Sequence, residues 1–143
     1  MNFNLKQYLL VSLISTTTLI SCKFNVTRTN NKDDINAANS VVDKYYSYLN
    51  DKDYPKIITI MGPTFLKNNN VEQFLKNIQT ANVVLGKQNG KSLLNATSKI
   101  TNEVGGCVLS YKVYYQNDST KQDFVLEDSN GIFKIASMRI TKL

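Results

Sequence analysis

The chain has 143 residues, a formal net charge of +6, and neither histidine nor tryptophan. The lack of histidine removes the commonest general base and the commonest zinc ligand. Its 17 basic side chains are scattered, whereas nucleic-acid binding needs a concentrated basic stripe, so no nucleic-acid partner is expected.

Residues 1–21 have the pattern of a secretory signal peptide. A short basic region with Lys6 precedes an apolar run from Tyr8 to Ile20, which is shorter than the roughly 20 residues of a membrane-spanning helix. The run ends in Leu19-Ile20-Ser21-Cys22, which resembles the bacterial lipobox. This resemblance implies cleavage before Cys22, a diacylglyceryl group on its sulfur and acylation of the new amine. Soluble export after ordinary signal cleavage is the alternative.

The lipobox predicts a lipoprotein of the bacterial cell envelope, held on a membrane by covalent lipid. Lys23 follows the cysteine where an aspartate favours the inner membrane in some bacteria, so the resemblance favours the outer membrane. Residues 22–35 are polar apart from the anchor and are predicted to form a flexible tether. Residues 36–143 have the size of one domain.

Three helices are predicted in the first half of this domain. Apolar side chains recur at helical spacing from Ile35 to Asn50, with Asp33 or Asp34 as cap. A short helix follows Asp53 and stops at Gly62-Pro63, and a third runs from its cap Asn70 to Leu85.

The period then changes to two, which predicts four strands joined by tight turns. They cover residues 94–100, 107–115, 122–127 and 132–140. Cys107, Leu109, Tyr111, Val113 and Tyr115 are predicted to face inward. Ser110, Lys112 and Tyr114 are predicted to face outward. The parity of the last strand changes near Ala136-Ser137, which predicts a β-bulge that bends the sheet.

The predicted fold class is therefore α+β, with N-terminal helices packed on a bent four-stranded antiparallel meander. The order of the elements and three short segments resemble cystatin-like or nuclear-transport-factor-two-like cone domains, in particular bacterial lipoproteins of that type. The segments are Asn50-Asp51-Lys52-Asp53-Tyr54 after the first helix, Leu85-Gly86, and Gly131-Ile132-Phe133-Lys134-Ile135. The resemblance implies a cone-shaped domain, and members of this fold often dimerise through the sheet face.

No reactive motif accompanies this fold, so neither a cofactor nor a metal is expected and the protein is predicted not to be an enzyme. Asp118, Asp123, Glu127 and Asp128 are interpreted as solvated turn carboxylates, and Cys107 as a buried apolar residue. A cavity, if formed, is predicted to be lined by Tyr45, Phe74, Tyr111 and Phe124.

Two functions are compatible with these features. The first is a non-enzymatic binding or interaction module on a membrane, for a small ligand, an envelope protein or a second copy through the sheet face. The alternative is a dehydratase- or isomerase-like cone enzyme for a small hydrophobic substrate, with a tyrosine as acid and a turn carboxylate as base.

Overall fold

The fold is α+β, with four helices and a five-stranded antiparallel sheet in residues 26–143, which the computed structural model describes. The predicted signal peptide and Cys22 lie outside the described residues. The elements are β1 (Thr27–Thr29), α1 (Lys32–Asn50), α2 (Tyr54–Thr59), α3 (Pro63–Asn68), α4 (Val71–Leu85), β2 (Gln88–Thr101), β3 (Val104–Tyr115), β4 (Ser119–Ser129) and β5 (Ile132–Lys142).

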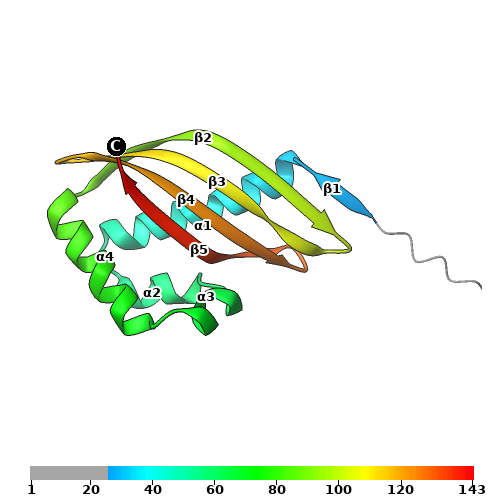
Figure 1. The fold of residues 1–143 in the computed structure, drawn as a ribbon, viewed down its shortest axis with the longest axis horizontal. Coiled ribbons are helices and arrows are strands. Elements are labelled where there is room, and N and C mark those ends of the chain that lie inside the picture. Colours follow the sequence, from blue (N-terminus) through cyan, green and yellow to red (C-terminus); the bar gives the residue numbers. More distant parts are fainter. Residues whose placement is uncertain (1–25) are drawn as a thin grey trace, which may run out of the picture.

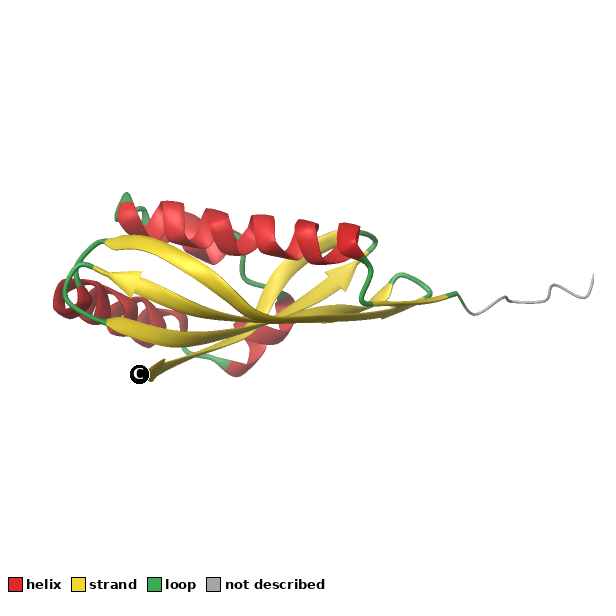
Figure 2. Cartoon of the chain, turned by 90° about the horizontal axis from the view of Figure 1, so that it is seen from above, coloured by secondary structure: helices red, strands yellow, loops and turns green. Residues whose placement is uncertain are grey.

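The strands lie side by side in chain order, from β1 at one edge to β5 at the other. Helix α1 runs along one face of the sheet, whereas α2, α3 and α4 lie beyond the β5 edge in the view of Figure 1. The view from above shows α1 on one side of the twisted sheet (Figure 2). We call the face under α1 the inner face and the opposite one the outer face.

The sheet has five strands in the described residues, and the prediction of four was wrong. Strand β1 pairs with the end of β2, with Thr27 opposite Thr101. It is β1 that lies inside the segment 22–35, which was predicted to be a flexible tether. The backbone N–H of Asn30 also donates to Ser98 O at 2.9 Å. Strand β1 is short and polar, so backbone pairing holds it in the sheet. Its sequence therefore has no alternation of apolar residues from which the strand could be predicted.

Helix α1 begins at Lys32, earlier than predicted. Its cap is Asn31, whose side chain accepts hydrogen bonds from the backbone N–H groups of Asp33 and Asp34, so neither aspartate is the cap. Asp34 is instead buried at the sheet, where its carboxylate accepts two hydrogen bonds of 3.2 Å from Arg28 of β1. This ion pair fastens β1 to α1.

The other helix ends follow local signals. Asp53 and Asn70 cap α2 and α4, as predicted, and Pro55 lies in the first turn of α2. The second helix was predicted to stop at Gly62-Pro63, but α2 already ends at Thr59, and Pro63 opens α3, a helix that was not predicted. No described helix combines the length and apolar character that crossing a bilayer requires.

Bulges bend the sheet in two long strands. Val125 pairs with Ser137 and Leu126 with Ile135, which leaves Ala136 as the extra residue and confirms the predicted bulge. A second irregularity lies between Leu93 and Asn95 of β2. It explains why Leu94 is 56% exposed, although it has the same parity along β2 as the buried Ser98 and Ile100.

The core lies between the inner face and α1. All five β3 residues predicted to face inward are buried, whereas Ser110, Lys112 and Tyr114 alternate with them on the outer face. From α1 come Ala38, Val42, Tyr45, Tyr46 and Leu49. The helix side of this core ends at the α1–α2 turn, where the candidate site opens.

Candidate functional site

Three of the four residues predicted to line a cavity pack against each other in the core. Tyr45, Tyr111 and Phe124 are almost completely buried. The Phe124 ring meets the Tyr45 ring edge-on at 5.6 Å and the Tyr111 ring at 6.1 Å between centroids. The fourth, Phe74 of α4, lies against Phe65 at 4.8 Å. These side chains thus form two ring clusters in the described structure.

A buried glutamine organises the hydroxyl groups of this core. Gln122 is fully buried, and its Oε1 accepts a 2.8 Å hydrogen bond from the Tyr46 hydroxyl. Its Nε2 donates to the Tyr115 hydroxyl at 2.7 Å and to Thr120 Oγ1 at 3.0 Å. The amide is thereby satisfied at low dielectric, where an unpaired polar group would be costly.

Burial raises the pKa of Tyr45, Tyr46 and Tyr115 above the ordinary tyrosine value, because the phenolate would lose its hydration. Tyr111 behaves in the same way, and the charge of Asp43 raises its pKa further. All four hydroxyl groups are therefore neutral at physiological pH and are weak acids, although they still donate hydrogen bonds.

The Tyr111 hydroxyl connects the core to a polar group at its edge. It donates a 2.6 Å hydrogen bond to Asn39 Oδ1, which also accepts one from Lys91 at 3.0 Å. The Lys91 ammonium group lies 4.4 Å from the centre of the Tyr111 ring and 3.0 Å from the Asp43 carboxylate. With its charge paired on both sides, Lys91 holds α1 against β2.

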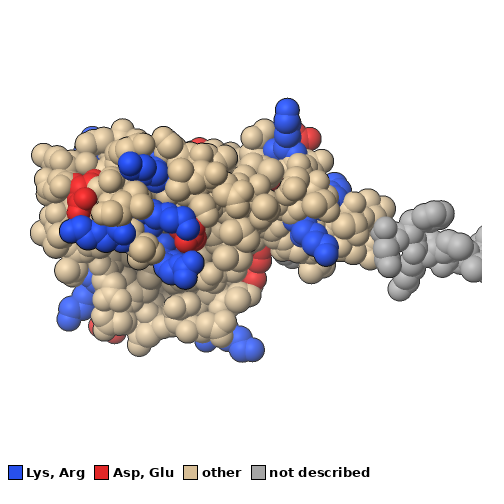
Figure 3. All heavy atoms as spheres, turned by 45° about the horizontal axis from the view of Figure 1, so that its top comes forward, with Lys and Arg blue, Asp and Glu red and all other residues tan. Residues whose placement is uncertain are grey.

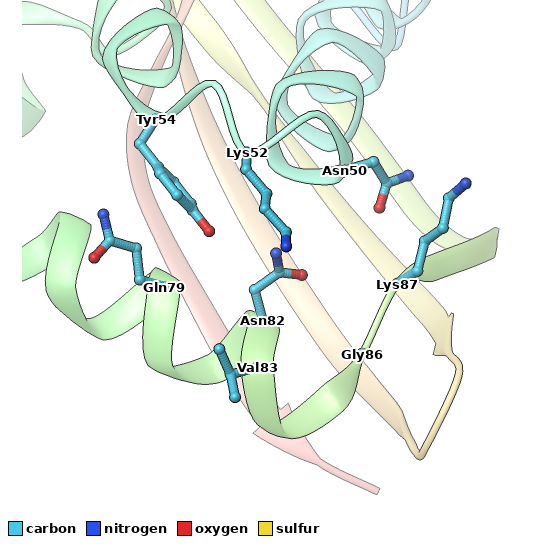
Figure 4. Close-up of a pocket in the computed structure, with 8 residues that line it drawn as sticks. All are labelled: Asn50, Lys52, Tyr54, Gln79, Asn82, Val83, Gly86 and Lys87. Atoms are coloured by element: carbon cyan, nitrogen blue, oxygen red, sulfur yellow. The ribbon is translucent and has the colours of Figure 1, made fainter.

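The candidate site is a cleft of about 740 Å³ between the α1–α2 turn and the C-terminal half of α4. We call it the helix-end cleft, and Figure 4 shows the Lys52, Tyr54 and Asn82 side chains directed toward the space between these helices. Its lining contains two lysines, three amides, a tyrosine, a valine and a glycine, but no carboxylate. These residues are Asn50, Lys52, Tyr54, Gln79, Asn82, Val83, Gly86 and Lys87.

Helix-ending signals in the sequence build the walls of this cleft. Lys52 has φ of +56°, a left-handed conformation that reverses the chain between α1 and α2. Gly86 ends α4 with φ of +76°, and a Cβ there would approach the side chain of Gln116 to 2.9 Å. Glycine is therefore required at this turn, which delivers Lys87 to the rim.

Backbone-directed amides hold the two walls together. Asn50 Oδ1 accepts a hydrogen bond from the Gln88 backbone N–H at 3.1 Å. Asn82 Nδ2 donates to the Leu49 carbonyl at 3.4 Å. In Figure 4 the Lys52 side chain extends toward Asn82 across the opening. Asn50 Nδ2 also donates to the Gln88 carbonyl at 3.3 Å and to Gln88 Oε1 at 3.5 Å. The cleft therefore offers the Gln79 amide, the second N–H of the Asn82 amide and two ammonium groups on long side chains.

This chemistry suits a ligand with acceptor oxygens and negative charge. Lysine ammonium groups and amide N–H groups donate hydrogen bonds to carboxylate or phosphate oxygens. No group of three histidine, cysteine, aspartate or glutamate side chains in the described part of the chain is placed to hold a metal ion.

Cys107 lies in the core, as expected, and its thiol is near the Asp34 carbonyl at 3.7 Å. Burial, with smaller contributions from Asp34 and Asp128, raises the pKa of this thiol to about 11. The thiol is therefore protonated at neutral pH and unreactive.

Asp128 was predicted to be a solvated turn carboxylate, and this was wrong. Its side chain faces the core beside Phe133 and is 5% exposed. Neither carboxylate oxygen has a hydrogen-bond partner of good geometry. Desolvation is the main cause that raises the pKa of Asp128, and the negative charge of Asp34 raises it further. The Gly131 N–H and the Arg28 charge lower this pKa and offset part of the increase. The carboxyl group of Asp128 therefore holds its proton more tightly in the folded protein than in the unfolded chain.

Comparisons with known proteins gave no match: no family model, curated protein or solved structure resembles this chain significantly. The cleft must therefore be interpreted from its own residues. Sequence reasoning missed it, although it found the helix ends that form it. The usable signal was the pair of lysines directly beside predicted helix ends, Lys52 and Lys87.

We predict that Asp128→Asn stabilises the protein near neutral pH. Because the folded pKa of Asp128 lies above its unfolded value, the acid's contribution to stability is full at low pH and is lost as pH rises through the folded pKa. The variant should gain about 1 kcal/mol at pH 7, with a smaller gain near pH 3. Urea unfolding followed by circular dichroism measures both values.

Asp118→Asn is the matched control. Hydrogen bonding by the Ser119 N–H, with Lys142 nearby, lowers the pKa of this exposed carboxyl, so its effect on stability has the opposite sign. It should bring no gain at pH 7. An Asp128→Asn chain less stable than its parent at pH 7 would contradict the prediction.

Proposed function

We propose that this protein is a lipid-anchored, non-enzymatic binding module of a bacterial cell envelope, whose helix-end cleft binds a small ligand carrying a carboxylate or phosphate group. The cleft carries the binding part of the proposal, since two lysines and three amides line it without a carboxylate. The lipobox Leu19-Ile20-Ser21-Cys22 carries the anchoring part. The outer membrane is the proposed location.

A cystatin-like cone is the proposed classification of the fold. Three features support it: α1 lies along the inner face of the sheet, the bulge at Ala136 bends that sheet, and β2 to β5 follow each other as a meander.

Cleft and anchor would lie at opposite ends of the domain. Helix α1 begins beside β1, and its 19 residues reach about 28 Å to the cleft at a rise of 1.5 Å per residue. With acylated Cys22 holding the β1 end on the membrane, the cleft would open toward the surroundings. This arrangement suits the capture of a ligand from the envelope space.

The enzyme alternative receives less support. A tyrosine acid and a carboxylate base would have to meet at one cavity within about 3 Å of the transferred proton. The helix-end cleft contains Tyr54 but no carboxylate in its lining, and burial weakens Tyr45, Tyr46, Tyr111 and Tyr115 as acids.

We also propose that a second copy of the chain binds the outer face. Val108 of β3 lies directly opposite Val125 of β4, and they are 40% and 41% exposed. The next row carries Asp123, whose carboxylate is 3.3 Å from Arg139. Figure 3 shows basic side chains gathered around acidic atoms on this side. A two-fold axis through this face would place the apolar residues of one copy against those of the other, and the acidic side chains of each copy against the basic side chains of its partner.

The first test replaces the anchoring thiol. We expect Cys22→Ala to leave the leader uncut or to release the chain, because no sulfur remains to accept lipid. Membrane fractionation of the variant and of the native chain would detect the release, and intact-mass measurement of both would show whether the leader is cut and lipid is attached. Unchanged processing and unchanged membrane association of the variant would contradict lipid anchoring.

The second test titrates the cleft with inorganic phosphate or citrate, followed by NMR shifts of side-chain amides. Shifts should concentrate at Asn50 and Asn82. We expect Lys52→Gln and Lys87→Gln each to weaken binding about tenfold, or ~1.4 kcal/mol, since each removes one charged donor. Lys76→Gln, on α4 but outside the cleft lining, is the control. Equal weakening by all three changes would contradict a defined site.

The third test measures self-association of an unacylated Cys22→Ala chain with the leader removed. Sedimentation should show a concentration-dependent dimer, and Val108→Asp should weaken it at least about tenfold by placing charge in an apolar contact. Val83→Asp on α4, where the parent side chain is 81% exposed, should have no effect. A monomer at every concentration would contradict the dimer.

A further inference from the structure

The β1 end of the domain carries exposed apolar side chains that nothing in the described structure covers. Val26, Val104 and Ile132 are 59%, 71% and 64% exposed. The hairpin turn at Asn102-Glu103 and the hairpin turn at Asn130-Gly131 project at this same end (Figure 1). Most other exposed apolar residues lie farther along the strands or on α4.

Sheet register places two of these side chains in one row. Val104 of β3 and Ile132 of β5 both pair with Ser129 of β4. Neighbouring strands lie about 4.8 Å apart, so the two backbone positions are separated by about 10 Å. Thr101 of β2 and Thr27 of β1 continue the row. The row forms a short apolar and hydroxyl-bearing margin across the sheet.

Val26 joins this margin through the β2–β3 turn. Its backbone N–H donates to Asn102 Oδ1 at 3.1 Å, and its carbonyl accepts from the Asn102 N–H at 3.0 Å. These two bonds fix the point at which the chain enters the domain. The polypeptide therefore meets the fold beside the apolar margin.

We propose that this margin rests on the lipid bilayer, with Val104 and Ile132 in the interfacial layer. The inference rests on the proposed acylation of Cys22. Only three residues lie between Cys22 and Val26, so the four Cα-to-Cα steps of an extended chain place Val26 at most about 14 Å from the anchored residue. The 14 residues of β2 extend over about 45 Å, so the far end of the sheet can stand well away from the membrane, whereas the short chain keeps the β1 end close to it.

The charges beside the margin suit the headgroup region. Arg28, which is paired with Asp34, lies in a groove with Val26. Lys134 lies in a second groove with Ile132, which Glu127 and Asp128 also line. Such cations approach lipid phosphates while their carbon chains stay near apolar groups. Glu103 at the turn favours a shallow contact, because a carboxylate is costly below the headgroups.

The absence of tryptophan from the chain permits a direct test with one reporter at a time. Full-length chains with Val104→Trp, Ile132→Trp or Val83→Trp would be made with the leader, extracted in detergent and reconstituted in phosphatidylcholine vesicles. The acyl chains carry bromine near their headgroup end. Val83 on α4 is the control because it is 81% exposed at the opposite end.

We expect brominated lipid to reduce the emission of V104W and I132W chains about twofold relative to unbrominated lipid, as an interfacial depth of about 5–10 Å allows. The V83W chain should keep its emission. Chains that float with the vesicles but show no quenching at either position would overturn the proposed contact and leave the anchor intact. Chains that neither float nor carry lipid mass on Cys22 would overturn the anchor and the contact together.

Discussion

The packing of α1 on the inner face of the sheet determines where everything else in this molecule lies. Tyr45 and Tyr46 pack on the inner face of the sheet and meet Phe124 edge-on, while Gln122 ties the Tyr46 hydroxyl to the sheet. The aromatic contacts bury apolar surface between helix and sheet, and the amide gives that burial a single arrangement. A rotated or shifted α1 would leave Gln122 Oε1 without its Tyr46 partner in the core. The helix is therefore fixed in register as well as in position.

A fixed α1 gives the two ends of the domain different chemistry. Its first turn is fastened to β1 through Asp34 and Arg28, and its last turn opens into the helix-end cleft through Asn50. The β1 end combines apolar side chains with few cations, whereas the cleft end combines lysines with amides. A domain with this polarity can stand on one surface and bind at the other end, without any conformational change to link the two.

Local signals explain how much of this arrangement could be predicted from the sequence. The caps Asp53 and Asn70, the alternation from Cys107 to Tyr115 and the bulge at Ala136 were all found, because each depends on a short stretch of chain. Strand β1 and the burial of Asp128 were missed, since both depend on residues distant in sequence. The cleft was missed for the same reason: two helix ends, more than 30 residues apart, form it. Ring-bearing residues were correctly placed inward, but parity could not distinguish a filled core from a cavity wall.

The burial of Cys107 has a consequence for where such a domain can work. It is the only cysteine among the described residues, it lies under α1, and its proton is held firmly. Oxidants and mixed disulfides act on accessible thiolates, and this site offers none. The folded domain should therefore be indifferent to the redox potential around it, equally sound in a glutathione-rich interior and in the oxidising space outside a cell.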